Sequence, residues 1–294
     1  MDNEKKMNLF NRAHRLRFNN DFDKYLEYLR KSVEVLCTSY GKIGGLWFDG
    51  NWSKPRGTDW KEDELYATIR KYQPDAMIIN NTGLSARGEL GHIELDSVTF
   101  ERGRPRPINL DDSPKYIASE MCQIFGNYWG YAKRDFNFKS LIEIIEDFCV
   151  CRRYGANYLL NIGPMGNGQL RPLDTAMLGA LGEWRDIYAE AMYLPRPTGI
   201  EVEGKEKNFL LKGDNCYYFF AHDLEISGDV NVELSKGNVN CQNVFKFDEK
   251  IKSVKWVDDG SDVFFTQEGD KTTIVAPPQL YGENLVVRVA KIEI

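Results

Sequence analysis

Residues 43–50 read IGGLWFDG, a short apolar run that ends in an acidic residue and a glycine. The run follows an amphipathic helical pattern, so it has the form of a strand in a β/α unit. Barrel enzymes place their catalytic groups at the carboxyl ends of such strands, where Asp49 falls. Trp47 lies two residues earlier, on the same face, and offers an aromatic wall suited to a sugar ring. The pair indicates carbohydrate chemistry more than phosphate or nucleic-acid chemistry.

Helical and strand patterns alternate on both sides of this run. After residue 21, apolar residues at alternating spacings of three and four predict one helix. Asp59 and Glu62 form a capping-box pair that opens a second helix, which Pro74 ends. Residues 76–81 are almost continuously apolar, as is typical of a parallel strand covered on both faces. The expected apolar stripe of the first helix is Phe22, Leu26, Leu29, Val33, Leu36 and Cys37.

Two more strands, over 123–130 and 157–162, are separated by a helix that Ser140 and Glu143 cap. Four strands alternating with helices indicate a parallel α/β arrangement. Beyond Pro195, short alternating runs with frequent turn signals are typical of an antiparallel β-sandwich. We therefore predict an α/β catalytic domain over residues 1–196 and a β-sandwich domain over residues 197–294.

The composition argues against several functions. The 38 basic and 44 acidic residues give a net charge of -6, which does not suit a nucleic-acid partner. No apolar stretch approaches the ~20 residues that cross a bilayer, and the first residues lack the apolar core of a signal peptide. Six scattered cysteines and three histidines suggest free thiols in a reducing cytoplasm, with no metal and no cofactor.

Residues 82–113 break the helical and strand patterns, because they are rich in Gly, Arg and Pro and have no sustained period. In a compact domain so long an irregular connection is usually functional. His92 in this segment could contact sugar hydroxyls, although a lone histidine in a loop is more often merely exposed. The segment also supplies the carboxyl groups of Glu89, Glu94, Asp96 and Glu101.

Four segments, taken in order and with a sandwich behind them, carry a resemblance to a known family. They are residues 22–26, 39–50, 129–131 and 155–164. Together they resemble glycoside hydrolase family 29, the α-L-fucosidases. The resemblance implies retaining hydrolysis of α-L-fucosides by double displacement, on a fucosylated oligosaccharide or glycoconjugate. It also implies that Asp49 is the nucleophile; the alternative interpretation of Asp49 is a carboxylate of an Asp-Gly turn.

Retaining chemistry needs a second carboxyl group about 5 to 5.5 Å from the nucleophile, to protonate the leaving oxygen and later to activate water. Residues 96–101 resemble the stretch in which family members carry this acid/base, which favours Glu101, with Glu94 as the runner-up. The alternative for Glu101 is a loop charge paired with Arg102 or Arg104. Trp47 and Trp129 match aromatic positions of the fucose pocket, although either could fill a core. The predicted substrate-binding residues are Trp47, Trp129, His92 and Glu94.

The sequence departs from the family in two places. After Asn80-Asn81 no arginine follows before Arg87, so a usual sugar contact is absent or comes from Arg87. The family's His-His-Asp-Gly strand, in the first half of its barrel, has no counterpart here. A (β/α)8 barrel typically takes ~250 residues, so we expect a partial (β/α)8, TIM-like barrel. The chain is then a fucosidase alone or as a homo-oligomer, a half-protein that needs a complementing half-barrel chain, or a non-catalytic glycan-binding remnant.

Overall fold

The computed structural model describes residues 22–81, 90–108, 113–228 and 241–294. They form two compact units: Met1–Thr99 with Asn109–Ile117, and Phe100–Ile108 with Ala118–Ile294. The chain passes from the first unit to the second within strand β3, Ser97–Glu101. The predicted domain boundary, between residues 196 and 197, differs from this division between the two units. It falls at the start of β6 (Arg196–Glu201), where the antiparallel strands begin. It stays a prediction about domains.

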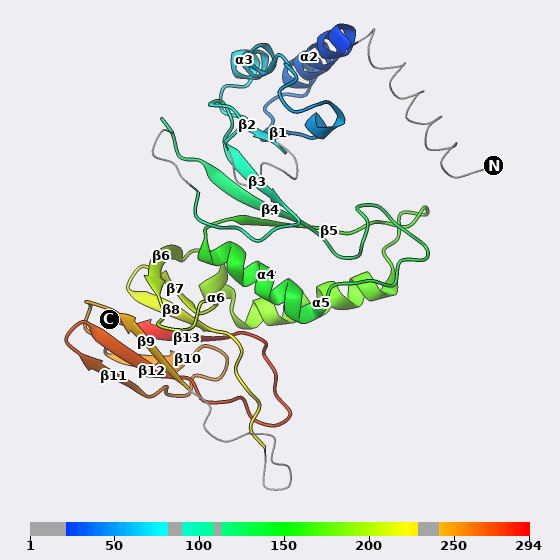
Figure 1. Ribbon diagram of the computed structural model, residues 1–294. Coiled ribbons are helices and arrows are strands. Elements are labelled where there is room, and N and C mark those ends of the chain that lie inside the picture. Colours follow the sequence, from blue (N-terminus) through cyan, green and yellow to red (C-terminus); the bar gives the residue numbers. More distant parts are fainter. Residues whose placement is uncertain (1–21, 82–89, 109–112, 229–240) are drawn as a thin grey trace. The chain divides into compact units, whose positions relative to one another are not determined.

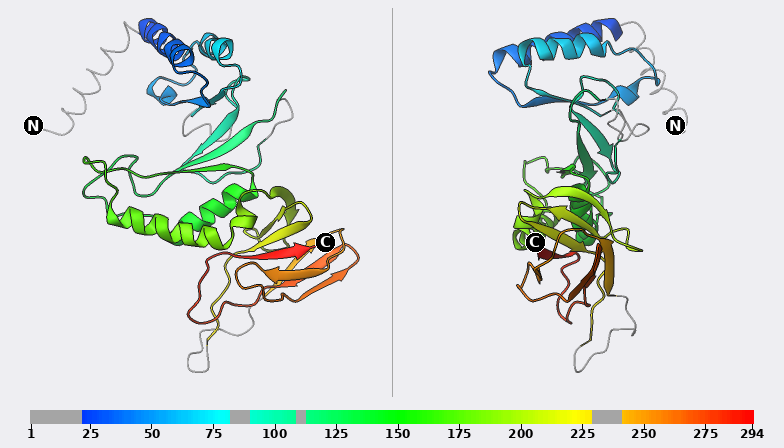
Figure 2. Two further views of the ribbon diagram at one scale, coloured as in Figure 1. Left: turned by 180° about the vertical axis from the view of Figure 1, so that it is seen from behind. Right: turned by 90° about the vertical axis from the view of Figure 1, so that its left-hand side faces the viewer.

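In the first unit, two helices cover one face of a pair of parallel strands, as Figures 1 and 2 show. Leu46 and Phe48 of the first strand pack with Ile78 of the second against this helical layer. The opposite face carries Trp47 and Met77, which are 39% and 41% exposed. The elements are α2 (Phe22–Ser39), β1 (Gly45–Phe48), the short 3-10 helix η1 (Asn51–Ser53), α3 (Glu62–Tyr72) and β2 (Met77–Asn80), and β2 pairs in parallel with β3.

Two expectations about this unit are wrong. Among the residues that the structure describes, helices cover the strand predicted over 76–81 on one face only, not on both. The capping box of α3 does not form, because the Asp59 carboxylate instead accepts hydrogen bonds from the backbone N–H and the Nζ of Lys61. Lys61, with φ 54, then precedes the first residue of the helix, Glu62. The helix α2 is confirmed, although Leu36 of its expected stripe is exposed.

The α/β part of the second unit holds two parallel strands and their helices. The capping box of Ser140 and Glu143 is confirmed: Ser140 Oγ accepts the Glu143 N–H at 3.2 Å, and Glu143 Oε2 accepts the Ser140 N–H at 2.8 Å. The sheet follows the order β1-β2-β3-β4-β5. The elements are β4 (Ala118–Ile124), α4 (Leu141–Arg153), β5 (Asn157–Asn161), α5 (Pro172–Ile187) and α6 (Ala189–Met192).

The strand predicted over 123–130 is wrong in its position, because β4 ends at Ile124. The aromatic residues that follow belong to a loop. The Asp135 carboxylate accepts the backbone N–H groups of Asn127 and Asn137, and these hydrogen bonds take the place of a strand ladder. Hydrogen bonds from a side chain to the backbone thus override a locally strand-like composition.

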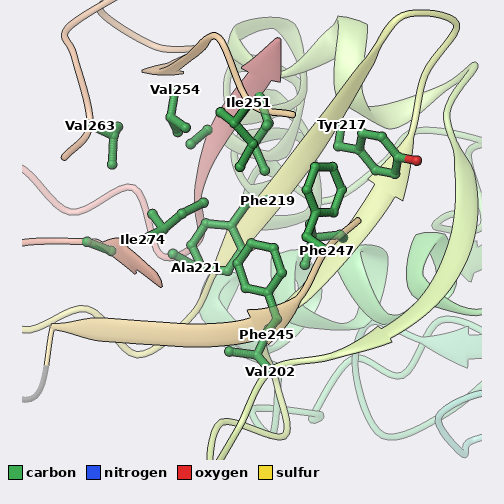
Figure 3. Close-up of a cluster of buried hydrophobic side chains, with 14 of the residues drawn as sticks. Val202, Tyr217, Phe219, Ala221, Phe245, Phe247, Ile251, Val254, Val263 and Ile274 are labelled. Carbon is green, nitrogen blue, oxygen red and sulfur yellow. The ribbon is translucent and has the colours of Figure 1, made fainter. Parts of the chain in front are cut away.

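The antiparallel part consists of two sheets, in the orders β10-β13-β8-β7-β6 and β11-β12-β9. Phe219, Phe245 and Ile274 are among the residues of the core between them (Figure 3). The other face of the five-stranded sheet packs on α4 and α5, where Trp184 Nε1 donates to Leu285 O at 2.7 Å. This shared core joins the sandwich to the helices. The remaining strands are β7 (Phe209–Lys212), β8 (Cys216–Ala221), β9 (Gln242–Lys246), β10 (Ser253–Trp256), β11 (Phe265–Glu268), β12 (Lys271–Val275) and β13 (Arg288–Glu293).

A buried histidine in the second unit predicts a pH-dependent stability. Neither ring nitrogen of His222 has a hydrogen-bond partner among the described residues. Burial lowers the pKa of His222 from 6.5 to about 4, so the unfolded chain binds more protons between these values. Stability is therefore expected to fall, by up to about 3 kcal/mol, as the pH drops through this window.

Unfolding of the chain at pH 4.5 to 7.5 checks this prediction, with His222→Phe as the comparison. The variant is expected to lose the part of the pH dependence that the histidine contributes, because phenylalanine has no proton to bind. Parallel stability curves for the two proteins would contradict it.

Candidate active site

Asp49 directly follows β1, and its carboxylate is held by one oxygen. Oδ1 accepts hydrogen bonds from the Gly50 N–H at 2.8 Å, from Asn81 Nδ2 at 3.3 Å and from Trp52 Nε1 at 3.4 Å. Gly50 has φ 99, a left-handed conformation that favours glycine and lets its N–H reach Oδ1. Among the described residues no hydrogen bond reaches Oδ2. The exposed side chain thus has one oxygen fixed and the other available for chemistry.

Trp52 and Asn81 are site residues that the sequence reasoning missed. Trp52 lies in η1, directly behind the Asp-Gly turn. Asn81 follows β2, and its backbone N–H donates to Phe48 O at 2.8 Å. The neighbouring Asn80 points to the opposite face, where its Nδ2 donates to Tyr66 Oη at 2.8 Å. The alternation of side chains along a strand was the signal that could have separated the two asparagines.

Trp47 lies on the same face of the sheet as Asp49, beside Ile79 of β2. Its ring is 39% exposed, and the helices α2 and α3 pack on the other face. Core filling, the alternative interpretation of Trp47, does not match this exposure. The ring forms an open aromatic wall two residues from the carboxylate.

Glu94 lies at the other end of the strands. Ser97 is level with Ile79 in the parallel register, and Arg70 binds both Ala76 O and Glu94 O, so Glu94 is level with residue 76. Asp49 is level with residue 81. Five residues of a parallel strand span about 16 Å, well beyond the roughly 5.5 Å of a retaining carboxyl pair. The structure therefore does not bring Glu94 to Asp49, either as acid/base or as a sugar contact.

The charges around Glu94 form a structural network instead. Arg70 Nε donates to Glu94 Oε2 at 3.0 Å, and Arg70 also binds Asp96 Oδ2 at 2.7 Å. Lys115 Nζ donates to Asp96 Oδ1 at 2.7 Å. Burial alone would raise the pKa of Asp96, but the hydrogen bonds from Lys115 and Arg70 outweigh it and hold this pKa below its usual value. Asp96 and Glu94 thus tie α3 to the start of β3.

His92 is engaged by the helical layer rather than by the face that carries Asp49. Its Nδ1 accepts the Glu94 N–H at 3.1 Å, so Nε2 carries the proton and donates to Asp63 Oδ1 at 2.9 Å. The ring packs edge-on against Tyr66 at 4.8 Å between centroids. Both nitrogens therefore have partners in α3 and its neighbourhood, and the predicted sugar contact of His92 is not supported by this position.

Glu101 and Trp129 belong to the second unit. Glu101 is the last residue of β3 and so lies at the carboxyl end of its strand. Asp49 has the corresponding place directly after β1. The two arginines of the alternative interpretation have other partners. Arg104 binds Asp147 Oδ1 at 2.8 Å, and Arg102 lies 5.7 Å from the centre of the Trp129 ring. Trp129 is 37% exposed, so it too is an open aromatic side chain.

Some expectations fall outside what the structure describes, namely those for Arg87 and Glu89. Among the described residues, no group of three or more His, Cys, Asp or Glu side chains could hold a metal ion. In the same part of the chain, no helix is both long and apolar enough to span a membrane.

The sequence matches known proteins over most of the α/β part. The family model described as alpha-L-fucosidase matches residues 2–190. The tissue alpha-L-fucosidase of Rattus norvegicus is 30% identical over 202 residues, which cover 65% of this chain and 41% of that protein. The Homo sapiens tissue alpha-L-fucosidase is 30% identical over 207 residues, or 67% of this chain and 42% of that protein. The chain spans less than half the length of these curated relatives.

Solved structures share the fold. Alpha-L-fucosidase isoenzyme 1 from Paenibacillus thiaminolyticus superimposes with a TM-score of 0.70 at 23% identity, over 94% of this chain and 64% of that one. A Bacteroides thetaiotaomicron alpha-L-fucosidase trapped as a covalent intermediate gives 0.67 at 20% identity, over 92% and 61%. The predicted class, a partial barrel followed by a β-sandwich, is confirmed. Because the family model covers more than half of its residues, the chain belongs to the alpha-L-fucosidase family.

Proposed function

We propose that this chain hydrolyses α-L-fucosides with retention of configuration, through a fucosyl ester on Asp49. The observation that carries the proposal is the carboxylate held at Oδ1 by three N–H donors, at the carboxyl end of a strand and beside the open ring of Trp47. A fixed carboxylate with one available oxygen is what nucleophilic attack at a sugar carbon requires.

In the first step Oδ2 of Asp49 attacks the anomeric carbon, while Glu101 gives its proton to the leaving oxygen. In the second step Glu101 takes a proton from water, the water oxygen attacks the same carbon, and the ester bond to Asp49 breaks. The negative charge then returns to the carboxylate, where the N–H donors on Oδ1 stabilise it. The sugar carbon is inverted twice, so its configuration is retained.

The stereochemistry of the first product tests this function. Proton NMR of an aryl α-L-fucoside with purified chain is expected to show the α anomer of fucose before mutarotation sets in. If the β anomer forms first, a water and not Asp49 attacks the sugar. If no hydrolysis occurs at high protein concentration, the chain is not an enzyme on its own, and the alternative of a glycan-binding role is favoured.

The uncovered face of β1 and β2 favours a second proposal, that another chain completes the pocket. Trp47 and Met77 are open on this face, and β1 ends the strand order of the described sheet. Exposed apolar faces of this kind mark interaction sites. The mass in solution decides whether the additional chain is a second copy. A monomeric mass together with full activity would contradict the proposal.

The indole N–H of Trp52 is expected to position the nucleophile. Trp52→Phe removes one hydrogen bond to Asp49 Oδ1 and keeps an aromatic ring. We expect kcat to fall by about 10-fold with KM little changed, because a hydrogen bond to a charged group contributes about 1.5 kcal/mol. The matched control is Trp60→Phe, since Trp60 packs on Phe22 and Tyr25 instead. An equal loss in both variants would show that Trp52 acts through folding alone.

A further inference from the structure

Two consecutive asparagines lie at the carboxyl end of β2, and their side chains point to opposite faces of the sheet. Asn81 donates to Asp49 Oδ1, whereas Asn80 is buried against α3. We propose that Asn80 is a positioning residue for the nucleophile: it fixes the end of β2 so that the Asn81 amide reaches the Asp49 carboxylate. The proposal rests on the function proposed above, and all of its residues belong to the first unit.

The Asn80 side chain is held by two residues of α3. Its Nδ2 carries two protons and donates to Tyr66 Oη at 2.8 Å and to Glu62 Oε1 at 3.0 Å. Glu62 and Tyr66 lie on one side of α3, because they are one helical turn apart. The Tyr66 hydroxyl is in turn hydrogen-bonded to the Glu62 carboxylate. The three side chains thus form a closed set of hydrogen bonds, which fixes the orientation of the Asn80 amide.

Tyr66 connects this set of hydrogen bonds to the strand that carries the nucleophile. Its ring is fully buried and packs on Phe48, the residue directly before Asp49, at 6.1 Å between ring centroids. In the parallel register Phe48 is level with Asn80, and Phe48 O accepts the Asn81 N–H at 2.8 Å. The ends of β1 and β2 are therefore held together from the helical side, next to Asp49 and Asn81.

The hydrogen bond that depends on this arrangement is a long one. Asn81 Nδ2 lies 3.3 Å from Asp49 Oδ1, just beyond the usual range of about 2.7 to 3.2 Å. A rotation or shift of Asn80 also moves Asn81, because the two residues share a peptide bond and their side chains alternate between the faces. A small movement of the strand end would therefore break the contact, and the Asp49 carboxylate would lose one of its N–H donors.

The polarity of Asn80 distinguishes this role from ordinary packing. The other side chains of β1 and β2 that face the helices are apolar, namely Leu46, Phe48 and Ile78. A buried amide gains little stability over an apolar side chain of similar size, because the cost of desolvation offsets its hydrogen bonds. A fully hydrogen-bonded amide does fix one orientation, and Asn80 does so at the residue before the donor to the nucleophile.

Two substitutions test the proposal. Asn80→Ala removes the buried amide, and Tyr66→Phe removes one of its acceptors but keeps the ring against Phe48. Both are expected to lower kcat on an aryl α-L-fucoside by about 3- to 10-fold with KM little changed, because each weakens one hydrogen bond to a charged group. Neither loss should exceed that of Asn81→Ala, since Asn80 acts through Asn81.

Two comparisons separate positioning from folding. In a double-mutant cycle, Asn80→Ala added to Asn81→Ala should cost almost nothing further in kcat, because the contact that it supports is already absent. Asn208→Ala is the matched control, since it removes a buried amide whose Nδ2 donates to Asn243 Oδ1 at 2.8 Å in the sandwich. It should lower the unfolding temperature and keep kcat. Losses that multiply in the double variant, or an equal loss of kcat in Asn208→Ala, would overturn the proposal.

NMR relaxation of the Asn81 side-chain amide gives a readout without turnover. Its signals are identified by their disappearance in Asn81→Ala. We expect a rigid amide in the unchanged chain and in Asn208→Ala, and a mobile one in Asn80→Ala and Tyr66→Phe. An amide that stays rigid in Asn80→Ala, or is mobile in the unchanged chain, would overturn the positioning role. Absence of turnover by a chain whose Asn81 amide is rigid would instead contradict the proposed function, so the two failures are told apart.

Discussion

Asp49→Gly is expected to lower kcat/KM on an aryl α-L-fucoside by at least about 10⁴-fold, because loss of a nucleophile removes the covalent route. Added azide should restore turnover, since the missing side chain leaves room for a small anion beside the sugar. Azide attacks from the side where Oδ2 would attack, so the expected product is β-L-fucosyl azide. Release of nitrophenol and NMR of the product measure both effects.

Two comparisons make this result specific. Asp49→Asn should be as inactive as Asp49→Gly, but azide should not rescue it, because the amide fills the space that azide needs. Asp75→Gly alters a carboxylate that binds Lys42 on the surface and should keep full activity. Turnover by Asp49→Gly within 10-fold of the unchanged chain, without azide, would rule out Asp49 as the nucleophile.

Glu101→Ala is expected to lose about 10²- to 10⁴-fold in kcat/KM on a fucoside with a poor leaving group, because no acid protonates the departing oxygen. On a dinitrophenyl fucoside the first step needs no such proton, and the loss should be far smaller. The ratio of the two losses, measured by steady-state kinetics, is the sign of a general acid. A uniform loss on both substrates would instead indicate a defect in binding or folding.

Glu94→Ala is the matched comparison for Glu101→Ala, because each substitution removes one carboxylate from the same segment of the chain. Glu94 binds Arg70 and lies at the amino ends of the strands. We expect its loss to lower the unfolding temperature modestly and to leave the dependence on the leaving group unchanged. A leaving-group dependence in Glu94→Ala, absent from Glu101→Ala, would exchange the two assignments.

Local patterns predicted most of the helices and the strand of Asp49, because each rests on periodicity and caps within a few residues. The failures are hydrogen bonds that apolar periodicity and cap spacing do not encode. Asp59 and Glu62 have capping-box spacing, yet Lys61 captures the Asp59 carboxylate. The strand predicted over 123–130 runs past the end of β4, and the hydrogen bonds of Asp135 and Asn161 hold the residues after Ile124 in a loop.

In the candidate site, too, some residues could be predicted from a local motif and others could not. Asp49 and Trp47 were predicted from one short motif, since both lie on a single strand and share a face. The carboxyl groups of Glu94 and Glu101 could not be separated by sequence, because the parallel register of β2 and β3 decides which one lies at the carboxyl end. Trp52 and Asn81 needed the fold as well, because their hydrogen bonds to Asp49 depend on a turn and on a neighbouring strand.

Mass spectrometry of the chain treated with 2-deoxy-2-fluoro-L-fucosyl fluoride tests the role of Asp49 most directly. The fluorine at carbon 2 slows the second step more than the first, so the ester should accumulate. We expect the intact protein to gain one fluorofucosyl group, and peptide mapping to place this group on Asp49. A label on any other residue, or turnover of fucosides with no label at all, would contradict it.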